Sequence, residues 1–258
     1  MSGWSEDNLP TGWDWREVAC VEAGSELAAS ILHTAWEEKP SLLLGAATGN
    51  SPTGAYGGFV QAIGEGARNP DVLRVIKLDE WGGLPMEDPA TCEIYLQNHL
   101  IGPLKLTDDR FASFRSDAES PENECRRIDK WLEREGPIDL CVLGLGLNGH
   151  LGFNEPAEAL TGDSHVAALA GTSLEHSMLE LTERRPSYGL TLGMGAILAS
   201  KTILLLIFGQ AKALPVQRML SGGIRPGFPA SFLTRHRQVI CVIDEDAARS
   251  ACGRDLGL

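Results

Sequence analysis

Five short runs of apolar residues divide the sequence. Leu, Ile and Val follow one another in most of them with little alternation of apolar and polar positions, which is typical of strands buried on both faces. The runs are residues 41–46, 72–78, 138–143, 202–208 and 238–243. Apolar residues at helical spacing predict helices in the intervening segments, at residues 21–36, 53–63, 90–100, 122–131 and 211–220. Strands that alternate with helices predict a mostly parallel sheet with helices on both faces, so we expect one α/β domain over residues 1–258.

The composition supports a folded chain and narrows its partners. Of the 258 residues, 43% are apolar and 22% are charged, values near those of globular proteins, so a disordered chain is excluded. Lys and Arg number 22 and Asp and Glu number 35, which gives a net charge of −13. Nucleic acids and anionic membranes call for a basic surface, so we expect neither as a partner. No run approaches the roughly 18 uninterrupted apolar residues of a membrane-spanning helix.

The N-terminus and the cysteines indicate a compartment. The first residues, MSGWSED, lack the basic stretch and apolar run of a secretory signal. The six cysteines are scattered with no CxxC pair, and Cys141 and Cys241 lie inside apolar runs, where we expect buried free thiols. A cytoplasmic protein with no metal site is the default expectation.

The segment after the first apolar run is a candidate phosphate site. In sheets of this class, ligands bind at the carboxyl ends of the strands. Residues 45–53 read GAATGNSPT, in which Ser51 suits the N-cap and Pro52 the first position of a helix. Free N–H groups and the helix dipole favour an anion at such a helix N-terminus. An ordinary strand-to-helix turn is the alternative, and no Gly-Lys-Ser/Thr follows that would make a Walker A loop.

Two adjacent carboxylates, Asp79 and Glu80, follow the second run, ahead of a Gly-Gly-Leu-Pro turn. They are candidates for base catalysis. Neighbouring residues of a strand point to opposite faces, so we expect the two to differ in role. Solvated acids that cap a strand are the alternative.

The segment after the third run, residues 144–156, reads GLGLNGHLGFNEP. Its glycines match the GxGxxG spacing of a dinucleotide site, but Gly152 and Pro156 interrupt the helix that such a site requires. A proton carrier and a carboxylate, His150 and Glu155, share this glycine-rich loop with Asn148. The carboxylate would orient the imidazole and stabilise its protonated form.

Lys212 follows the fourth run, just before the helix whose first turn accommodates Pro215. A helix dipole disfavours a cation at this end, and a bound anion would reverse that preference. A plain surface lysine is the alternative.

These four segments, in this order, resemble the family of glucosamine-6-phosphate deaminases and deaminating galactosamine-6-phosphate isomerases. The matching pieces are residues 47–53, 78–85, 144–156 and 209–212, with similar pieces at 190–195 and 229–236. The resemblance covers roughly residues 20–246. The specific piece is Gly-His-x-x-Phe-Asn-Glu-Pro, because the related 6-phosphogluconolactonases share the Gly-His but lack the Phe-Asn-Glu-Pro.

The resemblance implies a modified Rossmann-like fold and the conversion of a hexosamine 6-phosphate to a ketose 6-phosphate with release of ammonia. Asp79 matches the base that moves the C2 proton, His150 the residue that opens the sugar ring, and Glu155 its carboxylate partner. The resemblance assigns the phosphate to Thr48, Gly49, Asn50, Ser51 and Lys212. We add Asn148 to the catalytic residues, and Ala47, Glu80 and Gly149 to the substrate-binding residues. Such an isomerisation needs no metal or redox cofactor if hydrogen-bond donors meet the enediol charge.

Two departures from the family pattern bear on the site. Asn148 stands where the glucosamine-6-phosphate enzymes have an aspartate, and it cannot take a proton. Together with its sequence context it resembles the galactosamine branch. We also expect a phosphate-binding arginine after Asn-Glu-Pro, but residues 161–181 contain none; they contain His165 and His176, and Arg184 and Arg185 follow.

Three functions remain open at this point. The first is a hexosamine-6-phosphate isomerase and deaminase that prefers galactosamine 6-phosphate. The second is a lactonase-like sugar-phosphate hydrolase, in which Asp79→Asn would leave substantial activity. The third is a non-catalytic sugar-phosphate sensor, which Asn148 alone favours. A small sugar phosphate is the expected partner in each, and assembly into a homo-oligomer stays open.

Overall fold

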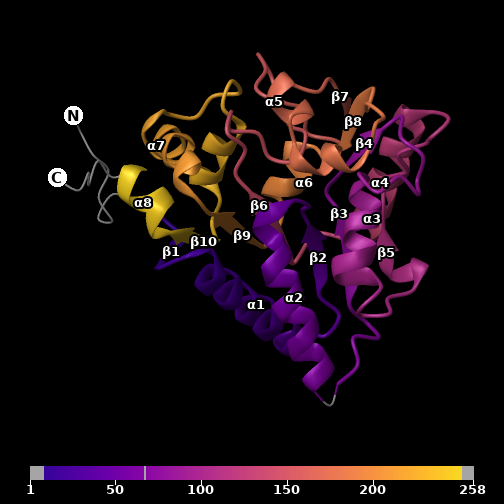
Figure 1. Cartoon of the computed structure of the whole chain (residues 1–258), viewed down its shortest axis with the longest axis horizontal. Coiled ribbons are helices and arrows are strands. Elements are labelled where there is room, and N and C mark those ends of the chain that lie inside the picture. The colour runs from indigo at the N-terminus through magenta and orange to yellow at the C-terminus, as the bar shows by residue number, and fades with distance from the viewer. Residues whose placement is uncertain (1–8, 67, 252–258) are drawn as a thin grey trace.

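The computed structural model describes residues 9–66 and 68–251, so Cys252 and the N-terminal residues quoted above lie outside it (Figure 1). Its main sheet has seven strands in the order β1-β10-β9-β6-β2-β3-β5, and every neighbouring pair is parallel. The strands are β1 (Trp13–Val18), β2 (Leu43–Ala46), β3 (Arg74–Lys77), β5 (Phe111–Ala112), β6 (Leu140–Gly144), β9 (Thr202–Ile207) and β10 (Val239–Asp244). The predicted α/β class with a mostly parallel sheet is confirmed.

Helices cover both faces of this sheet, as predicted. On one face lie α1 (Val21–Glu38), α2 (Asn50–Glu65) and α3 (Cys92–Leu96), which continues as a π-helix over Gln97–Ile101. On the other face lie α4 (Pro121–Glu135), α6 (Met194–Leu198), α7 (Ala213–Ser221) and α8 (Glu245–Ala251). Figure 1 shows α1 and α2 side by side below the sheet and α7 and α8 at one end of the molecule.

Alternate residues of the central strands enter two separate cores. In β9, Ile203, Leu205 and Ile207 pack in the core under α4, α6 and α7, whereas Leu204 and Leu206 pack in the core under α1 and α2. All five side chains are fully buried. This is why the strand reads as a continuous apolar run, since neither of its faces meets water.

A second, smaller sheet stands beside the carboxyl end of β3. It is antiparallel, in the order β4 (Asp79–Gly82), β8 (Tyr188–Thr191) and β7 (His165–Ala167). Only residue 78 separates β3 from β4, so the chain leaves the main sheet and enters the small one at once. This small sheet has an apolar cluster of its own, in which the rings of Trp81 and Phe153 pack with their centroids 4.5 Å apart.

The strand order changes direction between β2 and β6. From β2 the chain proceeds outward to β3 and β5, then returns to β6 on the other side of β2. Such a switch opens a crevice at the carboxyl ends of the two strands, which is where ligands of α/β sheets bind. Short segments close around it: α5 (Gly171–Leu174) and the 3₁₀ turns Ser177–Leu181 and Gln210–Lys212. No helix in the described part of the chain is long and apolar enough to cross a membrane.

Candidate active site

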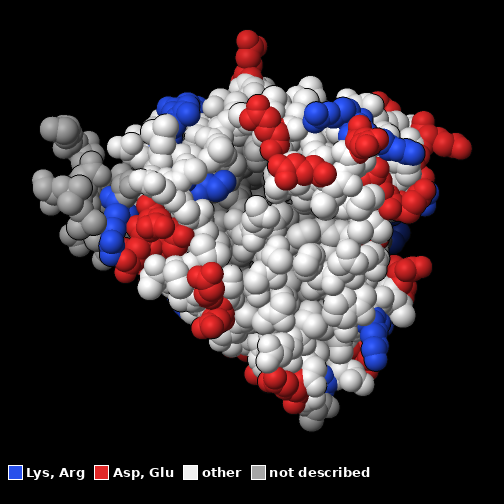
Figure 2. All heavy atoms as spheres, viewed as in Figure 1, with Lys and Arg blue, Asp and Glu red and all other residues white. Residues whose placement is uncertain are grey.

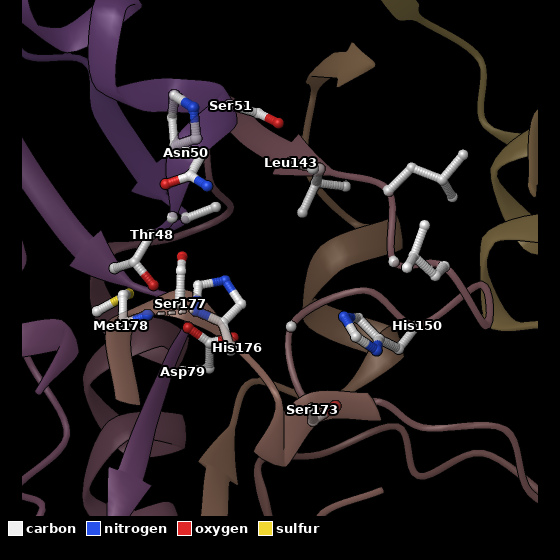
Figure 3. Close-up of a pocket in the computed structure, with 18 of the residues that line it drawn as sticks. Thr48, Asn50, Ser51, Asp79, Leu143, His150, Ser173, His176, Ser177 and Met178 are labelled. Atoms are coloured by element: carbon white, nitrogen blue, oxygen red, sulfur yellow. Dashed lines mark hydrogen bonds between the residues drawn. The ribbon is translucent and has the colours of Figure 1, made fainter. Parts of the chain in front are cut away.

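A cavity of about 520 Å³ lies at this switch point, which is a size typical of small-ligand sites. Segments that follow four of the parallel strands line it. They contribute residues 47–52 after β2, Asp79 and Trp81 after β3, residues 144–147 and His150 after β6, and Gly209 and Lys212 after β9. Residues 172–178, which follow no strand of the main sheet, form another wall. The structure therefore brings together the four segments that the sequence singled out. Figure 3 shows Thr48, Asn50 and Ser51 on one side of the cavity and His150 on the opposite side.

Helix α2 begins two residues earlier than the predicted Ser51 N-cap implies. The helix starts at Asn50, and its N-cap is Gly49, whose φ of 105° lies where glycine is favoured. The predicted cap role of Ser51 is therefore wrong, because Ser51 already belongs to the first turn. No side chain caps this end of α2. The N–H groups of a first turn have no partner within their helix, so they can donate to an anion in the cavity.

Asp79 and Cys92 share one wall of the cavity. The thiol of Cys92 lies 3.9 Å from Oδ1 of Asp79 and 3.3 Å from the hydroxyl of Thr48, which donates to it. Burial and the charge of Glu80 raise the pKa of Asp79 to about 7, against the lowering effects of His150 and Lys77. Near neutral pH this carboxyl group can therefore both accept and return a proton.

Glu80 faces away from the cavity, as the alternation along a strand predicts. Its carboxylate is fully buried and lies 2.5 Å from Nζ of Lys77. It also accepts hydrogen bonds from the backbone N–H groups of Trp81, Cys92 and Glu93, at 2.7 to 2.9 Å. These partners occupy the carboxylate outside the cavity. The expected contact of Glu80 with substrate is thus corrected to a structural role, in which it ties β4 to the start of α3.

His150 reaches the cavity, and Glu155 stands behind it. Nδ1 of His150 lies 3.4 Å from Oε2 of Glu155, an ion-pair distance that is long for a hydrogen bond. Asn148 joins the two: its oxygen accepts from the backbone N–H of His150 at 3.0 Å, and its amide donates to the Glu155 carboxylate at 2.8 Å. The hydroxyl of Ser173 also donates to that carboxylate. Asn148 and Glu155 do not line the cavity, so they can act only through His150.

The pKa of Glu155 is low. Its burial would raise the pKa, but His150, Ser173 and Asn148 outweigh that effect and lower it to about 2. Glu155 is therefore ionised throughout the neutral range. A fixed negative charge therefore lies next to the imidazole of His150, on the side away from the cavity.

The glycines of this loop differ in what they touch. Gly146 lines the cavity, and a Cβ on it would stand 2.4 Å from the ring of His150, so only glycine permits this close approach. Gly149 does not line the cavity: a Cβ there would meet the ring of Phe228 at 2.5 Å. The expected substrate contact of Gly149 is therefore corrected to packing. No helix begins in this loop, which agrees with our rejection of a dinucleotide site.

Lys212 lies on the other side of the switch point from Asp79, because Lys212 follows β9 whereas Asp79 follows β3. Its Nζ donates to the carbonyl oxygen of Leu145 at 2.7 Å, and burial lowers its pKa. It immediately precedes α7, as predicted. Lys212 is therefore a partly buried cation that faces the cavity, in contrast to the alternative of a plain surface lysine.

Some cavity residues were not among the sequence candidates. Cys92 and Trp81 line it, as do residues 172, 173 and 175–178, which include Ser173 and His176. The only signal for His176 was its place in a stretch without arginine. His165, noted in the same stretch, instead lies in β7 with Nδ1 3.1 Å from the carbonyl oxygen of Asp163. Arg184 and Arg185 are also absent from the cavity lining.

The comparisons with known proteins agree with one another. A family model described as "Glucosamine-6-phosphate isomerases/6-phosphogluconolactonase" matches residues 16–241. A protein of Escherichia coli (strain K12) named "Putative deaminase AgaI" is 40% identical over 229 residues, which are 89% of this chain and 91% of that one. A glucosamine-6-phosphate deaminase of Clostridium perfringens (strain 13 / Type A) is 34% identical over 230 residues, 88% of this chain and 95% of that one.

The solved structures give the same picture. That of a monomeric glucosamine-6-phosphate deaminase superposes with a TM-score of 0.87 at 33% identity, over 92% of this chain and 99% of that one. A 6-phosphogluconolactonase from Thermotoga maritima superposes with a TM-score of 0.70 at 16% identity, over 91% of this chain and 100% of that one, which shows a shared fold alone.

Proposed function

Because the chain belongs to the glucosamine-6-phosphate isomerase and 6-phosphogluconolactonase family, we propose that it converts a hexosamine 6-phosphate to a ketose 6-phosphate and ammonia. The observation that carries this proposal is that two separate acid–base groups line one cavity. Asp79 has a pKa of about 7, and His150 is backed by the permanently ionised Glu155. Aldose–ketose isomerisation requires one group at the ring oxygen and another at C1 and C2, and this cavity supplies both.

The reaction divides between these two groups. His150 gives a proton to the ring oxygen and takes one from the C1 hydroxyl, which opens the ring. Asp79 then removes the C2 proton while the C1 oxygen gains a proton, which gives an enolamine with a double bond between C1 and C2. Asp79 returns its proton to C1 while the amino nitrogen loses one, so that the double bond now joins C2 and nitrogen. Water adds to the resulting C2 imine, and ammonia leaves, so that one water is consumed and one ammonia is released. Asp79 must be ionised for its first step and protonated for its second, which a pKa near 7 permits.

The phosphate belongs, in this proposal, between the first turn of α2 and Lys212. The free N–H groups of that turn and the Lys212 ammonium are the donors that a phosphate prefers. Holding the phosphate far from C1 and C2 would orient the reacting carbons without taking part in the chemistry. The net charge of −13 is no obstacle, because these donors act locally.

Two other functions compete with this one. A hydrolase of the lactonase kind needs no proton transfer at C2, so it gives no reason for a carboxyl group with a pKa near 7 opposite His150. A sensor would bind without turnover, and Asn148 in place of a carboxylate is the feature that favours it. The contacts of Asn148 offer an answer: it positions His150 and Glu155 through hydrogen bonds.

Ammonia release tests the proposal. The protein is incubated separately with galactosamine 6-phosphate and glucosamine 6-phosphate, and ammonia and ketose are measured together. We expect both products in equal amounts, with the galactosamine epimer favoured, since Asn148 and its context resemble that branch. Release of ammonia from neither sugar would overturn the proposal. Hydrolysis of 6-phosphogluconolactone without ammonia release would support the hydrolase.

A further inference from the structure

The imidazole of His176 presents a donor to the cavity. Its Nδ1 accepts a hydrogen bond from the backbone N–H of Met178 at 3.2 Å, which Figure 3 draws as a dashed line. Because Nδ1 is an acceptor there, the single proton of the neutral ring resides on Nε2. The ring also packs near Trp81, with centroids 6.1 Å apart. The orientation of Nε2 is therefore fixed from two sides.

Nε2 of His176 faces the loop that leads into α2. A Cβ on Gly49, the N-cap of that helix, would stand 3.3 Å from this nitrogen. Over the described residues, no protein atom accepts a hydrogen bond from Nε2. A fixed donor thus lies beside the free N–H groups of a helix N-terminus, in a cavity that also holds the Lys212 ammonium.

The charged groups around the cavity affect the protonation of His176. Lys212 and His150 are the other basic groups that line it, and Asp79, Glu175 and the thiol of Cys92 are its acidic groups. Burial lowers the pKa of His176, and the charges of His150 and Lys212 lower it further. The basic groups therefore repel the protonated imidazole while the cavity is empty. A doubly charged anion between His176 and Lys212 would replace this repulsion with attraction.

We propose that His176 is a phosphate-binding residue, which together with Lys212 and the first turn of α2 holds the substrate phosphate, and that it binds a proton when the phosphate binds. This inference rests on the proposed function, because it places the phosphate group of a hexosamine 6-phosphate at that end of the cavity. The neutral ring can donate one hydrogen bond to the phosphate through Nε2. The protonated ring donates a charge-assisted bond, which is about twice as strong.

A dependence of affinity on pH follows. Phosphate stabilises the protonated imidazole and so raises the pKa of His176 in the complex. Affinity then falls as the pH rises through that value, because the proton must be taken up on binding. The phosphate group titrates in the same range, with a second pKa of about 6. Dividing the affinity of the wild type by that of His176→Gln at each pH cancels the contribution of the phosphate group. Glutamine keeps an N–H donor but does not titrate, so the ratio reports the proton on His176.

The experiment compares three variants with the wild type. In His176→Ala, we expect KM for galactosamine 6-phosphate to rise about tenfold at pH 6.5, the equivalent of one charge-assisted hydrogen bond, with kcat changed less than about twofold. The Kd of inorganic phosphate, measured by calorimetry, should rise by the same factor. His176→Gln should match the wild type more closely at pH 8 than at pH 6. His165→Gln is the matched control, because that ring lies in β7, away from the cavity, and should leave both constants unchanged.

The readouts separate this inference from the proposed function. If no hexosamine 6-phosphate releases ammonia but His176→Ala weakens phosphate binding, then the inference holds and the reaction is wrong. If ammonia is released and both His176 variants keep the KM and the phosphate Kd of the wild type, then the inference is wrong. A variant that fails to fold is replaced by a titration of the wild-type imidazole resonances by NMR. There, an unchanged pKa of His176 on addition of phosphate would equally overturn it.

Discussion

Glu155 lies against His150 with its Oε2 oxygen 3.4 Å from Nδ1 of the imidazole. The same oxygen accepts the amide of Asn148, and the other carboxylate oxygen accepts the hydroxyl of Ser173. Asn148 can only donate to this carboxylate, where an aspartate would compete with it for protons. The loop thus contains one permanent negative charge rather than two, and that charge belongs to Glu155.

Substitution of His150 or Glu155 should impair ring opening in particular. We expect His150→Ala to lower kcat/KM for the closed-ring substrate by about 100-fold or more, the contribution of a general acid–base group. An analogue that lacks the 5-hydroxyl cannot form the six-membered ring and should be affected far less. Glu155→Gln should follow the same pattern more weakly, because it removes the negative charge behind the imidazole but leaves the imidazole itself. Equal losses on both substrates would contradict the role given to His150.

Substitution of Asp79 distinguishes an isomerase from a hydrolase. Asp79→Asn keeps the shape of the side chain but cannot move a proton, so we expect ammonia release to fall by about 1,000-fold or more. Exchange of the C2 hydrogen in D₂O should disappear with it. Cys92→Ala serves as the control for packing at the same wall of the cavity. An Asp79→Asn protein that keeps substantial turnover would favour the hydrolase.

The pKa of Asp79 also predicts how stability varies with pH. That pKa rises from 3.8 in the unfolded chain to about 7 in the folded protein. Between these values the folded state binds more protons than the unfolded state, so stability falls as the pH rises through this window. Asp79→Asn removes this effect, and we expect it to gain roughly 2–4 kcal/mol of unfolding free energy at pH 8 and almost none near pH 4.

Urea unfolding at the two pH values measures this difference. The exposed Asp71, changed to Asn, is the control and should show no such dependence. If the Asp79 and Asp71 variants responded alike, the raised pKa would be wrong. The same carboxyl group should appear in kinetics as a rise of kcat/KM with pH up to about 7, because the ionised form is the base.

Lys212 should act on binding rather than on chemistry. We expect Lys212→Ala to raise KM for hexosamine 6-phosphates by about tenfold or more, with kcat little changed, because a phosphate contact persists in both the ground and transition states. Lys130→Ala, at an exposed position of α4, is the control. An unchanged KM in Lys212→Ala would show that this lysine has no part in the site.

The strands of the main sheet could be predicted wherever both of their faces are buried. Five such strands appear as apolar runs, whereas the edge strand β1, with sequence WDWREV and half-exposed positions, carries no such signal. The strands of the small sheet could not be found in this way, because they are three or four residues long and pair across distant parts of the chain.

The site was predictable as far as it follows the strands. Asp79, His150 and Lys212 come after parallel strands, and the rule that ligands bind at carboxyl ends brings them together. Alternation along a strand predicts that Asp79 and Glu80 diverge but not which of them faces the cavity. Ser173 and His176 follow no strand of the main sheet, so only the folded structure places them at the site.

The acidic side chains of the surface are dispersed, so the net charge of the molecule does not determine the charge inside the cavity. Figure 2 shows acidic side chains in several separate groups on the face seen there, with basic side chains between them and uncharged surface around them. A chain with a net charge of −13 can therefore keep a local cation such as Lys212 in its cavity. Charge complementarity at the scale of the whole molecule carries little information about a ligand this small.

In the segment of residues 172–178, the number of residues between two of its contacts is fixed. Within it, Ser173 holds the carboxylate behind His150, while His176, only three positions later, lines the cavity beside the N-cap of α2. Only Leu174, the last residue of α5, and Glu175 separate these two contacts. A single residue inserted or deleted between them could keep one contact only by displacing the other. This part of the chain should therefore tolerate substitutions far better than changes in length.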